Sequence, residues 1–420
     1  MIRHALRALI VVSLTSAFGL AGDWPAFRGP YGNGISTEKN VPLKWSKTEN
    51  IKWKAALPAP GNGSPIVSKG KVFVTVATDA GKKRSLLCFD RKTGEKLWAT
   101  HVSFDGDEPT HGTNPHGSST PVADGERIVV WHSSAGLYCY DYDGNKRWNR
   151  DLGAFRHVWG YGQSPVVFED NVILNCGPGE RTFVIAVDRK SGETVWQTDE
   201  AGGASGLESE PGKRAAWIGS WSTPMLVQVE GKPQILVSFP HHVNAYDPKT
   251  GKIIWTCDGL GDLVYTSPVI GDGVAVAMGG FHGPAIGFKL GGSGNVTETN
   301  RLWHAKARNP QRIGSGVIIG KHLFMANASE SLGQCLVVET GEELWRERMP
   351  GGDNWGSMIF VDGRLYVTNQ SGSTNVIAPN PTKLELLATN ELGDRSNSTP
   401  AFSDGQIFLR TLQNLWCIGE

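Results

Sequence analysis

The amino-acid sequence predicts an all-β fold, an eight-bladed β-propeller made of four-stranded antiparallel blades. Two observations predict it: a phrase that recurs eight times along the chain, and a composition suited to short strands and tight turns. The 420 residues include 53 glycines and 15 tryptophans, and no long stretch rich in Ala, Glu and Lys favours an extended helix. A closed all-β fold of this length is commonly a single domain.

The recurring phrase is a small residue, usually followed by Pro, then a few apolar residues, a turn and an alternating strand. Two copies, at Gly316-Val317 and Met358-Ile359, lack the Pro. The copies with Pro are Ser64-Pro65, Thr120-Pro121, Ser164-Pro165, Thr223-Pro224, Ser267-Pro268 and Thr399-Pro400. The turn residues recur about every 48 positions, which is the spacing of propeller blades. They are Gly70, Gly125, Asn171, Gly231, Gly273, Gly320, Gly363 and Gly405.

A second phrase, Asp-x-x-Thr-Gly followed by a Trp, closes most repeats, as in Asp90 to Trp98. The Asp can bond the turn backbone and the Gly can take a positive φ, so the phrase predicts a hairpin between the third and fourth strands. The Trp then lies at a fixed height on the outer strand and packs against the next blade. The predicted docking tryptophans are Trp53, Trp98, Trp148, Trp196, Trp255, Trp303 and Trp345.

The two ends of the chain predict how the ring closes. The eighth repeat stops after its third strand, residues 414–418, and an unassigned strand that carries Trp53 lies at residues 51–56. Pairing the two completes the eighth blade and covers both exposed edges. The predicted organisation is a signal peptide at 1–21, an N-terminal extension at 22–49 and one propeller domain at 50–420.

The first residues have the pattern of a cleaved signal peptide. Basic residues precede an apolar run from Ala8 to Leu20 that is too short to span a bilayer. We therefore expect an exported protein, periplasmic or extracellular. The first cysteine is Cys88, so no lipid attachment is expected at the mature N-terminus. The 41 basic and 41 acidic residues balance, which argues against nucleic acid as a partner, and no later segment resembles a transmembrane span.

The Asp-x-x-Thr-Gly-x-x-x-Trp phrase resembles the tryptophan-docking repeat of pyrroloquinoline-quinone (PQQ) propellers, and the resemblance covers residues 50–420. The segment from Trp24 to Pro30 is similar to the opening of exported PQQ-like repeat proteins. The resemblance implies the propeller fold. It does not imply one activity, because the repeat serves alcohol and sugar dehydrogenases and also the cofactor-free propeller lipoprotein of the outer-membrane protein assembly machinery.

The cysteines do not follow the pattern of quinoprotein alcohol dehydrogenases, which place two adjacent cysteines beside the cofactor. No two of the six cysteines are neighbours here. Four of them share the third strand of their repeats with Ala or Gly in other copies, so we expect small, buried, structural side chains. These four are Cys88, Cys139, Cys335 and Cys417. The pairing of Cys176 and Cys257 stays open at this stage.

The irregular loops before the inner strands line one mouth of the channel in a propeller, so we expect a ligand site there. Aromatic rings beside arginines and amides suit a flat, anionic or polar ligand. The predicted site residues are His116, Arg156, His157, Trp159, Trp221, Tyr265, Arg312, Asn354, Trp355, Arg395 and Asn397. The same loops carry His111, Asn114, Trp217 and Gln311. We assign no catalytic residue and no metal ligand, because Asp353-Asn354 imitates only part of a Ca²⁺ site.

Three functions from different classes fit these observations. The leading interpretation is a non-enzymatic binding or scaffold propeller in the cell envelope or outside the cell, a monomer without a cofactor that holds a protein or glycan partner. The second is a PQQ- and Ca²⁺-dependent oxidoreductase for alcohols or sugars, in which Trp159, Trp221 or Trp355 stacks on PQQ and Arg312 or Arg395 pairs with its carboxylates. The third is a factor for outer-membrane protein assembly.

Overall fold

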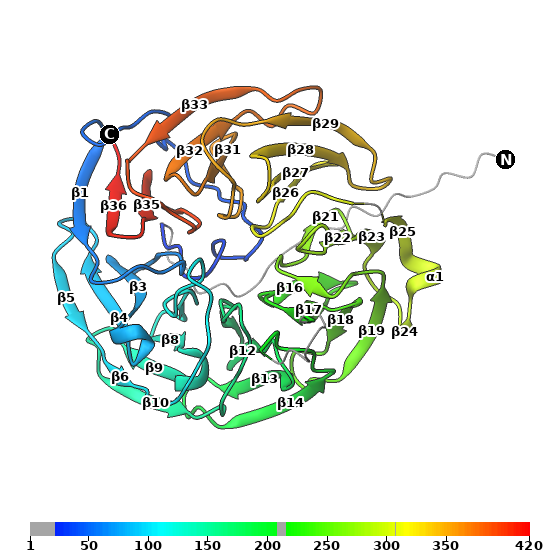
Figure 1. Ribbon diagram of the computed structural model, residues 1–420, viewed down its shortest axis with the longest axis horizontal. Coiled ribbons are helices and arrows are strands. Elements are labelled where there is room, and N and C mark those ends of the chain that lie inside the picture. The colour runs from blue at the N-terminus through cyan, green and yellow to red at the C-terminus, as the bar shows by residue number, and fades with distance from the viewer. Residues whose placement is uncertain (1–21, 208–215, 307) are drawn as a thin grey trace.

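The computed structural model describes residues 22–207, 216–306 and 308–420, so the predicted signal peptide lies outside the described residues. The described chain closes into a ring of sheets around a central axis, and the strands of each sheet lie side by side in order from the centre to the rim (Figure 1). The described residues form eight blades, each built on four antiparallel strands, and two of the blades carry one extra short strand. The predicted eight-bladed propeller is confirmed.

In blades 1 to 4 the strands follow chain order from the innermost to the outermost. Blade 1 is β2 (Ile66–Ser68), β3 (Lys71–Thr78), β4 (Lys83–Asp90) and β5 (Lys96–Ala99), with the short β6 (Val102–Ser103) also on β4. Blade 2 is β7 (Val122–Ala123), β8 (Arg127–Trp131), β9 (Leu137–Asp141) and β10 (Lys146–Arg150). Blade 3 is β11 (Val166–Phe168), β12 (Asn171–Cys176), β13 (Thr182–Asp188) and β14 (Thr194–Glu200). Blade 4 is β16 (Met225–Val229), β17 (Lys232–Phe239), β18 (His242–Tyr246) and β19 (Ile253–Asp258).

Blades 5 to 7 repeat the arrangement, and blade 8 is completed from the other end of the chain. Blade 5 is β21 (Val269–Gly271), β22 (Val274–Met278), β23 (Ala285–Lys289) and β25 (Arg301–Ala305). Blade 6 is β26 (Val317–Ile319), β27 (His322–Ala326), β28 (Leu332–Val337) and β29 (Glu343–Arg348). Blade 7 is β30 (Ile359–Val361), β31 (Arg364–Thr368), β32 (Ser373–Ile377) and β33 (Leu386–Glu391). Blade 8 is β34 (Ala401–Ser403), β35 (Gln406–Arg410), β36 (Asn414–Ile418) and β1 (Ile51–Ala56).

The ring closes as the sequence predicts. Strand β1 pairs antiparallel with β36, and Trp53 lies opposite Cys417. Elements outside the repeat are short: the 3₁₀ turns Asp79–Gly81 and Ser133–Ala135, the helix α1 (Thr297–Asn300), and the parallel pair β15 (Gly219–Ser220) and β20 (Leu263–Val264). Within the described residues no helix is long and apolar enough to cross a membrane.

The repeat tryptophans join neighbouring blades in one recurring way. The indole Nε1 of Trp98 donates a 3.0 Å hydrogen bond to the carbonyl of Tyr142 in the turn of blade 2, and a Cβ added to Gly144 of that turn would lie 2.9 Å from the indole ring. The turn must therefore carry a glycine where the ring packs. Equivalent bonds run from Trp53, Trp148, Trp196, Trp303 and Trp345 to carbonyls of the next blade.

Trp255 on the outer strand of blade 4 differs from this pattern. Its Nε1 donates instead to Oε1 of Gln234 within the same blade, at 2.9 Å. The reason is the glycine-rich insertion in blade 5, which replaces the short turn that other blades present. Its strand β24 (Gly294–Asn295) pairs in parallel with β19 beside Trp255 and helps to bury the ring completely.

The register explains why the third strand carries a small residue in the blades that have a Trp on the outer strand. Cys88 lies directly opposite Trp98 in the pairing of β4 with β5, and Gly287 lies opposite Trp303 in blade 5. All six cysteines are buried and unpaired in the described chain. Burial raises the pKa of the Cys88 thiol to about 12, so this thiol stays protonated and inert near neutral pH.

A closed belt of eight hydrogen bonds links the inner strands. In each blade the backbone N–H of one Ser or Thr donates to the side-chain oxygen of its counterpart in the next blade, with N···O distances of 2.9 to 3.1 Å. We call these residues the belt: Ser64, Thr120, Ser164, Thr223, Ser267, Ser315, Ser357 and Thr399. In the six copies with Pro, the belt residue is the small residue directly before the Pro. In the two copies without Pro, the belt residues Ser315 and Ser357 lie directly before Gly316 and Met358 and keep the hydroxyl.

The N-terminal extension crosses the channel before it joins the rim, as the dark blue trace in Figure 1 shows. Residues 22–36, which we call the plug, bond to the inner strands of several blades. Trp24 exchanges two backbone hydrogen bonds with Val67 of blade 1, and the backbone N–H groups of Ala123 in blade 2 and Phe360 in blade 7 donate to carbonyls of the plug. The plug is therefore a built part of the ring.

Candidate functional site

A cavity of about 400 Å³ lies at the mouth of the central channel, a size typical of small-molecule sites. The belt forms its lower ring, because seven of the eight belt residues are in its lining; Ser164 is not. The loops that precede the inner strands form its upper wall. Phe27 of the plug completes the lining from the far side.

The residue two positions before each belt residue lines the cavity in every blade. These residues are Asn62, Ser118, Gly162, Trp221, Tyr265, Ile313, Trp355 and Asn397. The residue three positions before each belt residue is instead buried away from it. This alternation is the period of extended backbone, in which successive side chains point to opposite sides. It decides which loop residues can touch a ligand.

Aromatic rings gather on one part of the wall and are held edge to face. Trp221 and Tyr265 have ring centroids 5.2 Å apart with an interplanar angle of 71°, and Trp159 and Trp217 are 5.8 Å apart at 81°. Nε1 of Trp221 donates to the carbonyl of Gly160 at 2.8 Å. Such T-shaped pairs hold the rings in defined orientations, so this part of the wall is preorganised.

Amides gather on another part of the wall, over blades 8, 1 and 2. Nδ2 of Asn397 donates to Oδ1 of Asn62 at 3.2 Å, and Nδ2 of Asn62 donates to the carbonyl of Thr113 at 2.9 Å. Asn114 donates to the carbonyl of Trp159 at 2.7 Å, which ties the amide part of the wall to the aromatic part. The amides are therefore fixed in orientation.

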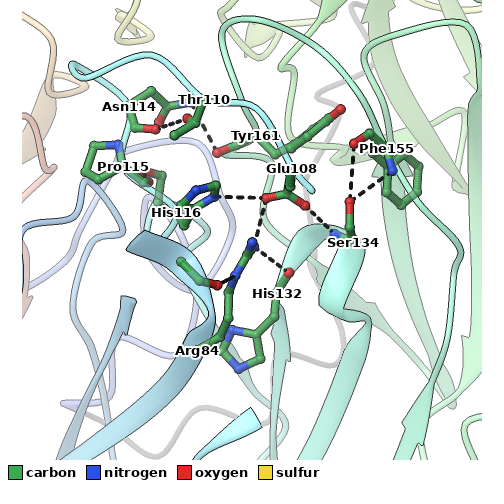
Figure 2. A network of polar contacts seen from close by, with 12 residues as sticks. Arg84, Glu108, Thr110, Asn114, Pro115, His116, His132, Ser134, Phe155 and Tyr161 are labelled. Carbon is green, nitrogen blue, oxygen red and sulfur yellow. Dashed lines mark hydrogen bonds and ion pairs between the residues drawn. The ribbon is translucent and has the colours of Figure 1, made fainter. Parts of the chain in front are cut away.

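The loop that carries His111 and Asn114 is anchored from below by a buried carboxylate (Figure 2). Oε1 of Glu108 accepts a 2.8 Å bond from Nη1 of Arg84, and both side chains are 1% exposed. Oε1 also lies 3.1 Å from Nδ1 of His116, and Oε2 accepts from the backbone N–H of Ser134 at 2.7 Å. This network holds the mouth loop against blades 1 and 2.

These contacts set the charge of the carboxylate. Burial alone would raise the pKa of Glu108, but hydrogen bonds from His116 and Ser134 together with the charge of Arg84 hold that pKa below its usual value. Glu108 is therefore ionised near neutral pH and paired with Arg84. A buried ion pair of this kind contributes most when all its partners are in place, which suits a structural anchor beneath the mouth.

Among the described residues that line the cavity there is no Asp, Glu, Lys or Arg, and His111 is the only imidazole. Nδ1 of His111 lies 2.8 Å from Oγ1 of Thr113 in the same loop, and its ring packs 4.5 Å from that of Trp159. The lining thus combines aromatic, amide and hydroxyl groups and carries no formal charge when His111 is neutral.

The structure brings together five of the predicted site residues: Trp159, Trp221, Tyr265, Trp355 and Asn397 line the cavity. The other six lie elsewhere. Arg156 and Arg395 are exposed outside the lining, and Arg156 pairs with Asp107 at 3.4 Å. His116 lies beneath the mouth loop on Glu108. His157 is fully buried, and burial lowers its pKa to about 4.

Arg312 and Asn354 miss the cavity for one shared reason. Each lies three positions before a belt residue and so points away from the channel, with 1% and 0% of its surface exposed. Nη2 of Arg312 donates to Oδ1 of Asn309 at 3.2 Å, and Nδ2 of Asn354 donates to the carbonyl of Asn327 at 3.3 Å. Neither can pair with a ligand in the cavity.

Several lining residues were not among the sequence predictions. Phe27 comes from the plug, Asn62 from the loop before blade 1, and Phe281, half exposed, from blade 5. The signal that could have found Asn62 is the hydroxyl shared by all eight repeats. Once the belt is recognised, the residue two positions earlier in each copy follows from strand alternation.

The lining does not fit PQQ with Ca²⁺. PQQ brings several carboxylates, which need cationic partners when they are removed from water, and the described residues of the lining include no Lys or Arg. Ca²⁺ takes carboxylate and carbonyl oxygens. No group of three or more His, Cys, Asp or Glu that could hold a metal ion occurs in the part of the chain that the structure describes.

Comparison with known proteins defines the family. The sequence profile described as outer membrane protein assembly factor BamB matches residues 35–256 and 82–345, which together cover more than half of the chain. The chain belongs to this BamB family of PQQ-like repeat proteins. The predicted resemblance to PQQ-like propellers is confirmed.

Individual relatives of this BamB-family chain are distant. The tetrathionate hydrolase of Acidithiobacillus ferrooxidans is 19% identical over 359 residues, which are 77% of this chain and 66% of that protein, just under two thirds of its length. BamB from Moraxella catarrhalis is 13% identical with a TM-score of 0.58, covering 87% of this chain and 98% of that one. Quinohemoprotein alcohol dehydrogenase from Comamonas testosteroni is 12% identical with a TM-score of 0.66, covering 95% and 81%. These structures share the propeller fold.

Proposed function

We propose that the protein is a non-enzymatic binding propeller, exported to the cell envelope or beyond it, and that the mouth cavity holds its ligand. The observation that carries this proposal is the lining itself. Its described residues present fixed aromatic rings, amides and hydroxyls and include no Asp, Glu, Lys or Arg. Such a surface recognises a ligand by shape and hydrogen bonds.

The same lining argues against catalysis. General acid–base work needs a titratable group positioned on the reacting atom, and nucleophilic catalysis needs a nucleophile beside a base that a third group orients. Among the described lining residues, His111 and Tyr265 are the only titratable side chains, and burial raises the pKa of Tyr265 well above neutrality. None of the described lining residues is a carboxylate that could orient His111.

A titration with PQQ tests the proposal against the oxidoreductase alternative. Purified protein from a host that makes no PQQ is titrated with PQQ, with and without Ca²⁺, while tryptophan fluorescence and the reduction of an artificial dye by alcohols and sugars are followed. We expect no Ca²⁺-dependent saturation and no turnover. Turnover that needs both PQQ and Ca²⁺, and that Trp221→Ala abolishes, would contradict the binding proposal.

The family match favours a second candidate, a role in outer-membrane protein assembly. In that case the ligand is a protein, and a blade surface rather than the cavity carries the activity. Crosslinking in envelopes of the native host distinguishes the two. Crosslinks to a β-barrel assembly complex that persist in Trp221→Ala and Trp355→Ala variants would favour assembly, whereas their absence favours the cavity.

A further inference from the structure

The mouth cavity is a cup that opens at one end. The mouth loops precede the belt along each inner strand, whereas the plug bonds to residues that follow it. Val67, Ala123 and Phe360 each lie three residues after the belt residue of their blade, about 10 Å further along an extended strand. Phe27 of the plug is in the lining, so a ligand enters from the mouth side and stops at the plug.

The belt offers hydroxyl protons to whatever fills the cup. Each belt oxygen accepts the backbone N–H of the preceding blade, as between Ser64 and Thr120 at 2.9 Å. A hydroxyl that accepts in this way still has its own proton to donate. Within the described residues no protein acceptor is seen for these protons. Seven of these hydroxyls line the cup, and they suit a ligand rich in hydroxyl and ether oxygens.

The aromatic rings offer apolar faces above the belt. Trp221 and Trp355 lie two residues before the belt on blades 4 and 7. Phe281 stands at the rim with 50% of its surface exposed. Trp221 and Trp355 are partly buried, and partly exposed aromatic rings in a concave site favour a ligand that covers them. A sugar ring does so with its C–H face while its hydroxyl groups meet the amides.

The shape of the cup and the lack of charge on its described wall together argue against peptides and the interior of polymers as its ligands. A closed cup receives the end of a chain or a free small molecule rather than the middle of a polymer. The end of a peptide is a charged amine or carboxylate, and burying either without a partner is costly. Phosphate and carboxylate ligands meet the same cost at the described wall of the cup, because none of its described lining residues is Lys or Arg. The end of a neutral glycan carries no charge.

We infer that the cup binds the terminal sugar units of an uncharged glycan. This inference rests on the proposed function, because it names the ligand of the same cavity. Trp221, Trp355 and Phe281 supply the stacking faces. Asn62 and Asn397, with the belt hydroxyls below them, supply the hydrogen bonds.

The test uses the purified mature chain and three neutral hexasaccharides: maltohexaose, cellohexaose and chitohexaose. Binding is measured by calorimetry and by tryptophan fluorescence. We expect at least one hexasaccharide to bind and Trp355→Ala to weaken it by about tenfold or more, the loss of about one stacking contact. Phe281→Ala, at an exposed rim position that folding does not need, is expected to weaken binding in the same direction. Leu97→Ala changes an exposed side chain on the outer strand β5, outside the lining; it is the control and leaves binding unchanged.

Chain length tests entry by the end. At equal sugar mass, the long polymer of the sugar that binds is expected to compete far less well than its hexasaccharide, because it has fewer ends. Equal competition by mass would overturn the inference, as would binding that Trp355→Ala and Phe281→Ala leave unchanged. Failure of all three hexasaccharides at millimolar concentration overturns it too. If PQQ, sulfate or oligogalacturonate then binds in a Trp355-dependent way without turnover, the proposed ligand site stands and only the sugar class is wrong.

Discussion

Removing one hydroxyl from the belt tests whether the belt stabilises the ring. Thr223 accepts a 3.1 Å hydrogen bond from the backbone N–H of Ser164, and both residues are buried. Thr223→Val keeps the shape of the side chain but leaves that N–H without its protein acceptor. A buried donor left unsatisfied costs about 1–3 kcal/mol.

This cost converts into a modest but measurable shift in melting temperature. At about 2 cal/mol/K per residue, the 420-residue chain has a total unfolding entropy of about 0.9 kcal/mol per kelvin. A loss of about 2 kcal/mol in the free energy of unfolding therefore lowers Tm by about 2 °C. Scanning calorimetry and the urea midpoint followed by tryptophan fluorescence both measure the effect. Replacing Thr120 as well, which accepts from Ser64, is expected to double it.

Two controls isolate the hydrogen bond. Thr223→Ser keeps the hydroxyl and is expected to remain near the parent protein, and Thr48→Val changes an exposed residue and is expected to have no effect. If Thr223→Val is as stable as Thr223→Ser, the belt contributes nothing measurable and this part of the account is wrong.

Three further predictions concern other parts of the ring. Gly94→Ala is expected to destabilise the protein far more than Gly70→Ala, and urea midpoints measure the difference. Both glycines have φ 72°, but only a Cβ at Gly94 would lie 2.6 Å from the ring of Trp53. Glu108→Gln is expected to lower stability by about 3–5 kcal/mol because it leaves Arg84 buried without its counter-charge; little change would refute the anchoring role. Burial and the charge of Arg84 lower the pKa of His132 to about 3. Below about pH 6.5 the His132 side chain therefore binds a proton in the unfolded chain but stays neutral in the folded ring. Stability should then fall by about 1.4 kcal/mol per pH unit as the pH drops from 6.5 toward 3, and His132→Gln should flatten that slope.

The fold was predictable because the recurring phrase occurs eight times and each copy predicts one blade. The Asp-to-Trp phrase predicts the hairpin at the rim, and in the structure the Trp98 indole bonds to the turn of the next blade. The strand at residues 51–56 was predicted to complete blade 8, and β1 pairs with β36. Trp255 shows the limit: its bond to Gln234 depends on an insertion whose position a repeat pattern does not give.

The site was predictable only in part. Of the predicted residues in the mouth loops, Trp221, Tyr265, Trp355 and Asn397 line the cavity. Composition alone could not separate them from Arg312 and Asn354, because neighbouring residues on extended backbone point to opposite sides. The register that separates them comes from the belt. Its members Ser315 and Ser357 are not followed by Pro, so a pattern defined by the Pro does not include them. The plug could not be placed, because residues 22–36 contain no repeat.

The central claim is that the cup at the channel mouth is the ligand site. The most direct test is a crystal structure of the protein soaked with the hexasaccharide that binds in solution. We predict ordered sugar in the cup, with a ring against Trp221 or Trp355 and its end pointing toward Phe27. Sugar bound on a blade edge or on the outer face, with an empty cup, would contradict the claim.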